Sequence, residues 1–360
     1  MKTITFTCET ITPMFLSGAD QNIPELRPPS IKGALRFWWR AMNGHLDLKD
    51  KKDEQGNLIK GLKTLESEIF GGTEPAQRSK VIVRVSHSSL NKSSNKLNGE
   101  KVHIEKWVYD RIVGKEVKRD IPIDLLEYLC YGTYEYERGK GNVFTREYFL
   151  PNQQFEVNFI FIDNQYVQEV VNAFCLIANF GGLGSRSRNG FGNFKVVSSD
   201  IDLPTQEDLL KKLKKGNKAS FTAFSNDIRI FKTTLSFPIV NDKGIKQNDV
   251  WKKALSKLAS AYRVSRSSLE TKHTYNKRIY IASPLIADNE THSFLDRHSK
   301  SFFLSIIEEN GQYNGVILYL PYLYLEGNTN YNKKRRENYD EFNTKFCELL
   351  LQNQLTEITI

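Results

Sequence analysis

The sequence predicts an α+β protein built from two tandem ferredoxin-like (RRM-like, βαββαβ) domains, with insertions in the first domain. Two observations support this prediction. Segments in which apolar residues alternate, as in half-buried strands, are interspersed with segments whose apolar residues have helical spacing. When the polar insertions are set aside, these segments follow the order β-α-β-β-α-β, and the same order occurs again in the C-terminal half. We therefore infer two copies of one fold, although no residue-level repeat accompanies them.

The first domain is assigned to residues 1–200. Its strands are expected at residues 3–10, 81–85, 155–161 and 193–197, and its helices at residues 31–42 and 166–180. Ser30 stands where the first helix would be capped, and Gly44 stands where it would end. The polar stretches 43–64 and 86–100 are expected to be loose loops.

Residues 101–150 are predicted to form an insertion with a short helix at 123–131. A basic connector with a helical piece is assigned to residues 201–220, and the second domain to residues 221–360. The elements expected in this domain are strands at 228–237, 302–307, 316–320 and 355–360 and helices at 250–262 and 339–351. Asn310-Gly311, between the two middle strands, is typical of a tight hairpin turn.

The composition describes a folded, basic protein. Of the 360 residues, 39% are hydrophobic and 12% aromatic, which excludes a disordered chain. The formal net charge of +9 favours a polyanionic partner. The four cysteines lie far apart and form no CxxC pair, so neither a zinc site nor a disulfide framework is expected. The chain shows no signal peptide and no bilayer-spanning apolar run, so we expect a cytoplasmic protein without membrane association.

A basic stripe on the first helix is the first candidate binding surface. At about 100° per residue, one face of this helix is apolar and is expected to pack on the core, through Ile31, Leu35, Trp38 and Met42. A basic stripe runs beside that face and is formed by Lys32, Arg36 and Arg40. Trp39 lies between the stripe and the apolar face. With Arg27 and the free N–H groups of the helix N-terminus, this stripe suits a polyanion backbone. The alternative is the solvated face of an ordinary amphipathic helix.

The glycine-rich segment 181–192 is the second candidate. Gly182-Leu183-Gly184 and Gly190-Phe191-Gly192 flank five polar residues, which are Ser185, Arg186, Ser187, Arg188 and Asn189. Glycines permit positive φ and close backbone approach, and arginines and hydroxyls suit phosphate contacts. No Gly-Lys-Ser/Thr follows, so the segment is not a Walker loop, and its spacing differs from the dinucleotide fingerprint. A plain helix-to-strand turn is the alternative.

Catalytic and cofactor chemistry have little support in the sequence. The six histidines form no metal-ligand pattern, and no nucleophile motif is present, so no catalytic residue, metal or cofactor is predicted. His45 is the one histidine near the basic helix, where it could act as a general base on a ribose 2′-OH.

These two segments resemble a known family. The loop GLGSRSRNGFG, at the end of a ferredoxin-like domain, resembles the hallmark loop of the RAMP superfamily of CRISPR proteins. The segment TPMFLSGADQNIPELRPPSIKGALRFWWRAM is similar to the N-terminal motif of the first subunit of the type III-B Cmr effector complex, and IFGG at 69–72 fits the same pattern. The resemblance covers residues 3–87 and 147–198. It implies a non-catalytic RNA-binding subunit near the crRNA 3′ end that helps to capture target RNA for antiviral defence.

The resemblance also implies partners and site residues. The partners would be crRNA, target single-stranded RNA and other Cmr subunits. The residues expected to line the RNA path are Arg27, Lys32, Arg36, Trp39 and Arg40 from the helix and Gly182, Gly184, Ser185, Arg186, Arg188, Asn189, Gly190 and Phe191 from the loop. Three alternatives stay open, namely a metal-independent endoribonuclease of the same superfamily that processes crRNA precursors with His45 as base, a scaffold for an acidic protein, and a DNA-binding regulator.

Overall fold

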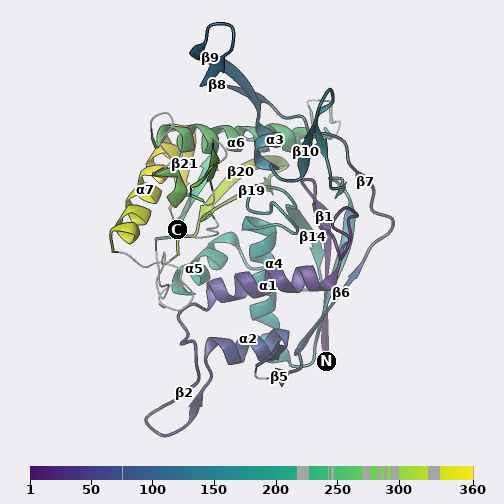
Figure 1. The fold of residues 1–360 in the computed structure, drawn as a ribbon. Coiled ribbons are helices and arrows are strands. Elements are labelled where there is room, and N and C mark those ends of the chain that lie inside the picture. Colours follow the sequence, from purple (N-terminus) through teal and green to yellow (C-terminus); the bar gives the residue numbers. More distant parts are fainter. Residues whose placement is uncertain are drawn as a thin grey trace.

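Two antiparallel sheets, one from each half of the chain, organise the computed structural model (Figure 1). The structure describes residues 1–74, 76–216, 227–241, 243–244, 247–270, 276–282, 285–287, 290–292, 300–322 and 333–359. The first sheet has the order β14-β1-β13-β6, from β1 (Lys2–Thr10), β6 (Val81–Ser86), β13 (Gln154–Phe161) and β14 (Phe194–Ser199). Ile4, Phe6 and Cys8 are buried on one face while their neighbours are partly exposed, as alternation predicts. All four predicted strands of this half are confirmed.

Helices α1 (Pro28–Met42) and α4 (Val167–Phe180) pack on each other and cover the apolar face of this sheet. Phe174 of α4 lies 4.8 Å from Phe6 between ring centroids. The predicted core face of α1 is buried as expected. The expected cap is wrong, because α1 begins at Pro28 with Arg27 as its N-cap residue, and Ser30 already lies in the first turn. The helix ends at Met42 with Asn43 as its C-cap residue, so the predicted stop residue Gly44 follows directly after the cap.

The second sheet has the order β16-β20-β15-β21, and β19 pairs with β20 outside that path. Its strands are β15 (Arg229–Thr233), β16 (Phe237–Pro238), β19 (Phe302–Glu309), β20 (Gln312–Tyr319) and β21 (Leu355–Ile358). One strand predicted at 228–237 is therefore two, β15 and β16. Asn310 and Gly311 have φ of 50° and 71°, as the predicted hairpin turn requires.

The strands β19 and β20 of the second sheet are buried on both faces. Helix α6 (Val250–Ser268) packs on one face, and α7 (Lys333–Gln352) packs on α6 and β21. The other face, which includes Phe303 and Ile307, joins the core of the first half and contacts α4. The layers therefore alternate as sheet, helices, sheet, helices (Figure 1). This arrangement explains why β19 and β20 are almost continuously buried.

The insertions contain more regular structure than expected. Helix α2 (Leu62–Phe70) begins inside the stretch predicted as a loop, because its apolar side packs into the first core. The insertion at 101–150 contains α3 (Leu125–Leu129), which confirms the predicted short helix, and a hairpin of β8 (Lys101–Asp110) and β9 (Lys115–Asp124) that projects from the body (Figure 1).

The remaining short elements border these parts. They are β2 (Lys51–Lys52), β3 (Leu58–Ile59), β4 (Gly72–Thr73), β5 (Ala76–Gln77), β7 (Lys92–Ser93), β10 (Tyr134–Glu137), β11 (Gly141–Phe144), β12 (Tyr148–Phe149), η1 (Asn164–Tyr166), η2 (Arg278–Tyr280), β17 (Leu285–Ala287) and β18 (Glu290–His292). The helical piece expected in the connector is α5 (Gln206–Gly216), and residues 217–220 of the connector lie outside the described residues.

All four cysteines are buried and free, which leads to a direct test of the core packing. Burial raises the pKa of the Cys130 and Cys175 thiols to about 12, so very little reactive thiolate forms at neutral pH. We expect Ellman's reagent to react with the native protein at least about tenfold more slowly than with the protein in guanidinium chloride. A thiol that reacts equally fast in both conditions would contradict this packing.

Candidate nucleic-acid interface

The glycine loop (residues 181–192) joins α4 to β14 in a compact turn. Gly184 has a φ of 94°, and a Cβ atom there would lie 2.3 Å from the carbonyl oxygen of Phe15. The Ser185 N–H donates to the same oxygen at 2.8 Å. Glycine is needed here because the loop backbone lies directly against residues 15 and 16, where a side chain has no room.

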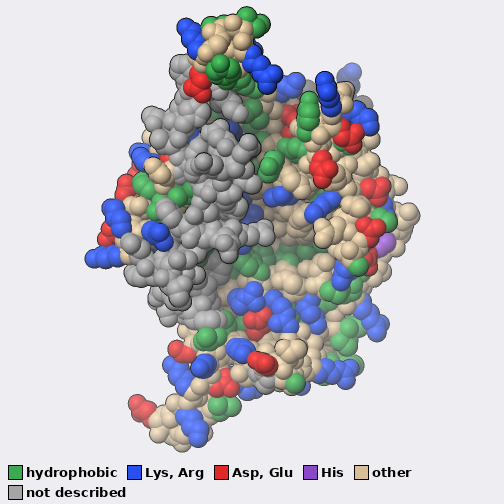
Figure 2. Space-filling view, viewed as in Figure 1, with side chains coloured by type: hydrophobic (Ala, Val, Ile, Leu, Met, Phe, Trp, Pro, Cys, Tyr) green, Lys and Arg blue, Asp and Glu red, His purple; other side chains and the backbone are tan. Residues whose placement is uncertain are grey.

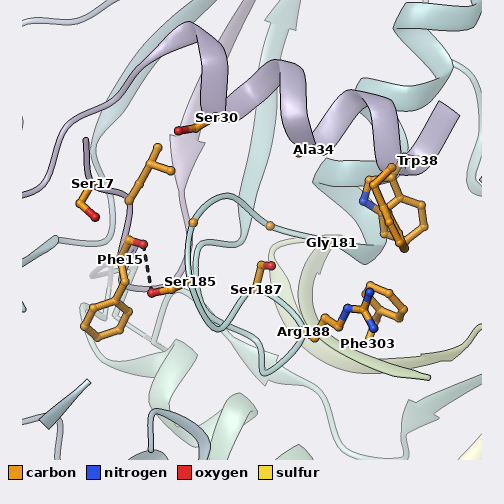
Figure 3. A pocket seen from close by; sticks show the side chains of 14 residues that line it. Phe15, Ser17, Ser30, Ala34, Trp38, Gly181, Ser185, Ser187, Arg188 and Phe303 are labelled. Carbon is orange, nitrogen blue, oxygen red and sulfur yellow. Dashed lines mark hydrogen bonds between the residues drawn. The ribbon is translucent and has the colours of Figure 1, made fainter. Parts of the chain in front are cut away.

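One side of the glycine loop lines an open cavity of about 450 Å³ (Figure 3). We call it the glycine-loop cavity. Its wall opposite the loop is the face of α1 between Ser30 and Trp38, and β19 contributes Phe303. The residues that line it are Phe15, Leu16, Ser17, Ser30, Ala34, Phe37, Trp38, Gly181, Gly182, Gly184, Ser185, Ser187, Arg188 and Phe303. These lining residues include four hydroxyl side chains and an arginine but no Asp or Glu, a set that suits an anionic ligand.

Arg188 is held at one end of this cavity, and Ser17 lies at the other (Figure 3). The Arg188 guanidinium carbon lies 4.5 Å from the ring centroid of Phe303 and 5.3 Å from that of Phe37. Its Nη1 donates to the backbone carbonyl of Lys300 at 2.7 Å. These contacts fix the orientation of the guanidinium, so it is preorganised for a phosphate or a base.

The basic stripe of α1 lies against α2 rather than along the cavity. Arg36 and Arg40 both form ion pairs with Glu66, at 2.9 and 2.7 Å, and Lys32 donates to the Ser79 hydroxyl at 3.0 Å. Burial, followed by repulsion from Arg36, lowers the pKa of Lys32. Figure 2 shows Lys and Arg side chains gathered over this region with acidic side chains among them. Glu66 pairs with two of the three cations, so the charge of the stripe is partly neutralised.

Trp39 has no exposed ring face. Its side chain is fully buried, its indole N–H donates to Glu169 of α4, and its ring packs 6.2 Å from Phe70 of α2. Stacking of Trp39 on a base is therefore excluded in this conformation. Arg27 is half-buried at the start of α1 and lies beside Gly18, and it is not among the residues that line the cavity.

Several loop residues hold the loop between the two halves instead of facing the cavity. Phe191 is fully buried, 5.5 Å from Phe15 between ring centroids. Asn189 donates to the carbonyl of Leu129 at 2.6 Å, and Gly190 packs against Leu255 of α6. Arg186, with a φ of 62°, places its guanidinium next to Gly132, after α3. Of the predicted loop residues, Gly182, Gly184, Ser185 and Arg188 line the cavity.

The cavity residues that the sequence did not predict include Ser30, Phe37 and Phe303. Ser30 and Phe37 lie on one face of α1 at helical spacing, a signal that was present but is weaker than the charged stripe. Phe303 lies more than a hundred residues from the loop in sequence, so no local pattern connects it with the site.

The candidate base His45 does not belong to the glycine-loop cavity. It is exposed in the segment after α1. Within the described part of the chain, no three His, Cys, Asp or Glu side chains are grouped as metal ligands. None of the helices described there is long and apolar enough to cross a membrane.

The chain with these antiparallel sheets and this glycine loop matches a known family. The profile of the RAMP superfamily matches residues 7–195, and the chain belongs to this superfamily. It is 29% identical to the CRISPR system Cmr subunit Cmr1-2 of Pyrococcus furiosus. The aligned 196 residues cover 53% of this chain and 93% of that protein. It is 28% identical to the CRISPR system Cmr subunit Cmr1-1 of the same organism. The aligned 199 residues cover 55% of this chain and 48% of that protein.

A solved structure supports the same assignment at the level of the fold. The crystal structure of Cmr1 from Pyrococcus furiosus in its apo form matches with a TM-score of 0.51 and 18% identity, over 99% of this chain and 98% of that one. The resemblance to the RAMP superfamily and to the first Cmr subunit is therefore confirmed, and an α+β fold with antiparallel sheets is shared.

Proposed function

We propose that this chain is an RNA-binding, non-catalytic subunit of a type III-B CRISPR Cmr effector complex. In this role it lies near the crRNA 3′ end in the cytoplasm and helps to capture target RNA for antiviral defence. Its partners are crRNA, target single-stranded RNA and other Cmr subunits. The likeness to two Cmr subunits supports the assignment. The observation that carries RNA binding is the glycine-loop cavity, where an oriented guanidinium and hydroxyls face aromatic rings.

The proposal includes two ferredoxin-like domains, residues 1–200 and 221–360, joined by the connector at 201–220. In each half the last strand lies beside the first, since β14 pairs with β1 and β21 pairs with β15. In each half the second strand pairs with the third, since β6 pairs with β13 and β19 with β20. This shared order supports duplication of one fold.

In the proposed complex, the glycine-loop cavity takes one nucleotide of a single strand. Its volume of about 450 Å³ lies in the range of small-ligand pockets and is too small for a duplex. Arg188 holds a phosphate, and the hydroxyls of Ser30 and Ser187 reach ribose or phosphate oxygens. Such contacts do not read base identity, so sequence choice stays with guide pairing.

The test is a fluorescence-polarisation titration of the purified protein with single-stranded RNA at two salt concentrations, with EDTA present. We expect Arg188→Ala to weaken binding about tenfold and to reduce the slope of log K against log salt by about one. Arg84→Ala, which removes an exposed arginine from β6, is the matched control and should change neither quantity. Equal affinities and slopes for the Arg188→Ala variant and the wild type would contradict the proposal.

The same samples, run on a gel, test the non-catalytic assignment. Intact RNA is the expected result. Specific cleavage that is lost in the His45→Ala variant would instead indicate the metal-independent endoribonuclease.

A further inference from the structure

An exposed aromatic side chain, Tyr131, lies on the insertion directly beside the glycine loop. It stands between α3 and β10, and 64% of its side chain is exposed. A single exposed aromatic residue is ordinary on a protein surface, so its meaning depends on its neighbours. The next residue, Gly132, lies against the guanidinium of Arg186, and a Cβ atom built at Gly132 would overlap the Nη2 atom of that arginine. The exposed ring therefore lies next to an arginine of the loop.

The insertion is anchored to the glycine loop, so Tyr131 has a fixed place relative to the loop. Asn189 of the loop donates to the carbonyl of Leu129, the last residue of α3, at 2.6 Å. Phe144 of β11 stacks on Phe15, with ring centroids 6.0 Å apart and planes 10° apart. Phe15 in turn packs on the loop. Contacts from α3 and from β11 therefore hold the insertion and the loop together.

A second tyrosine supports the ring of Tyr131 without enclosing it. The ring centroids of Tyr131 and Tyr134 are 6.2 Å apart and their planes lie at 86°, an edge-to-face contact. The Tyr134 hydroxyl donates to the carbonyl of Glu127 at 3.1 Å, and its ring packs 5.8 Å from that of Phe144. An edge-to-face contact covers at most one face of a ring. At least one face of Tyr131 is therefore open to a stacking partner.

The two arginines of the glycine loop lie on different sides of it. Arg188 lines the glycine-loop cavity, together with Ser185 and Ser187 (Figure 3). Arg186 stands between these two serines in the sequence, but its guanidinium lies against Gly132. A strand that leaves the cavity across the loop toward the insertion therefore passes a second positive charge before it reaches the exposed ring.

We propose that Tyr131 is a stacking platform for a base of the single-stranded RNA whose neighbouring nucleotide occupies the glycine-loop cavity. Arg186 lies between the two positions, where its charge attracts the connecting phosphate. Binding sites for single strands combine a basic path with aromatic rings, and stacking accepts any base. The insertion thereby takes part in RNA binding. This inference rests on the proposed function, and the experiment below separates the two.

The signature of a stacking platform is a loss of affinity without a change in salt dependence. Tyr131→Ala should weaken the binding of single-stranded RNA about tenfold, as loss of one stacked base does. The slope of log K against log salt should stay unchanged, because no ionic contact is removed. Since Tyr131 is exposed, the melting temperature should also stay at the wild-type value.

Three further variants separate stacking from other contacts. Tyr131→Phe keeps the aromatic ring and should bind like the wild type. Tyr131→Leu keeps an apolar side chain without a ring and should bind like the alanine variant. Tyr109→Ala removes an exposed tyrosine near the tip of the projecting β8–β9 hairpin and is the matched control, with wild-type affinity expected. Wild-type affinity in either Tyr131→Ala or Tyr131→Leu would overturn the inference.

A second measurement uses single-stranded RNA that carries one 2-aminopurine, placed at successive positions, because stacking on a tyrosine ring quenches this fluorescent base. At one position the wild type and Tyr131→Phe should quench the fluorescence more strongly than Tyr131→Leu. Equal quenching by the three proteins at every position would contradict a stacked base at Tyr131.

The outcomes also separate this inference from the proposed function. If Arg188→Ala impairs RNA binding while Tyr131→Ala does not, the proposed function stands and the platform is not part of the RNA path. If Tyr131→Ala binds RNA normally but no longer assembles with the other subunits, Tyr131 is a protein contact and the inference is overturned. If the wild type binds no RNA, the proposed function fails and the inference fails with it.

Discussion

Gly192→Ala should destabilise the protein by about 3 kcal/mol or more, the largest effect that we expect from any single methyl group. Gly192 has a φ of 70°, a region that costs an L-residue about 1–2 kcal/mol. A Cβ atom at this position would also lie 1.9 Å from the carbonyl oxygen of Leu183, inside the glycine loop. Because that neighbour is backbone, the clash cannot be relieved by turning a side chain, and the loop must open.

Gly33→Ala is the matched control for this substitution. Gly33 lies in α1 with an exposed α-carbon, and nothing lies within 4 Å of a Cβ built there. Alanine should stabilise the helix by about 0.5–1 kcal/mol. Urea unfolding measures both variants. Equal unfolding midpoints for Gly192→Ala and the wild type would show that the loop does not adopt the conformation described here.

Asn193→Ala should cost about 3 kcal/mol, because it leaves two buried backbone groups without partners. Asn193 is fully buried directly after the glycine loop. Its Oδ1 accepts from the Ile306 N–H of β19 at 2.9 Å, and its Nδ2 donates to the carbonyl of Gly181. One side chain thereby connects the loop of the first half with the sheet of the second.

Amide hydrogen exchange distinguishes this effect from a general loss of stability. The Ile306 amide should exchange faster in the Asn193→Ala variant under conditions where the first sheet is still protected. Asn158→Ala is the control, since Asn158 is partly exposed and accepts one bond from the Thr5 hydroxyl at 2.9 Å. We expect it to cost less than about 1 kcal/mol. Equal costs for the two variants would contradict the connecting role of Asn193.

Local patterns were sufficient for most of the regular structure. The alternation in 155–161 predicted β13, helical spacing predicted α4 and α6, and Asn310-Gly311 predicted the β19–β20 turn. The buried face of α1 followed from its period. These features depend on residues within a few positions of one another, where backbone geometry alone relates spacing to orientation.

The candidate site could be predicted only in part. The glycine loop was identified from its residues, and Arg188 lines the cavity as expected. The stripe of α1 was identified as well, but its charges are partly neutralised by Glu66, on the unpredicted helix α2. Trp39 lies at the edge of the apolar face, and packing of α2 and α4 on that edge buries it. A helical wheel describes one helix and contains no information about its neighbours.

The sequence by itself determined the family, the element order and the existence of a basic, glycine-rich loop after α4. Only the tertiary structure decided what this loop contacts. Phe303, Asn193 and Lys300 meet around it because the second sheet packs on α4 and brings β19 to the loop. These contacts join residues that lie a hundred positions or more apart in the sequence. Local backbone preferences cannot select such contacts, which form because the two halves bury a shared apolar core.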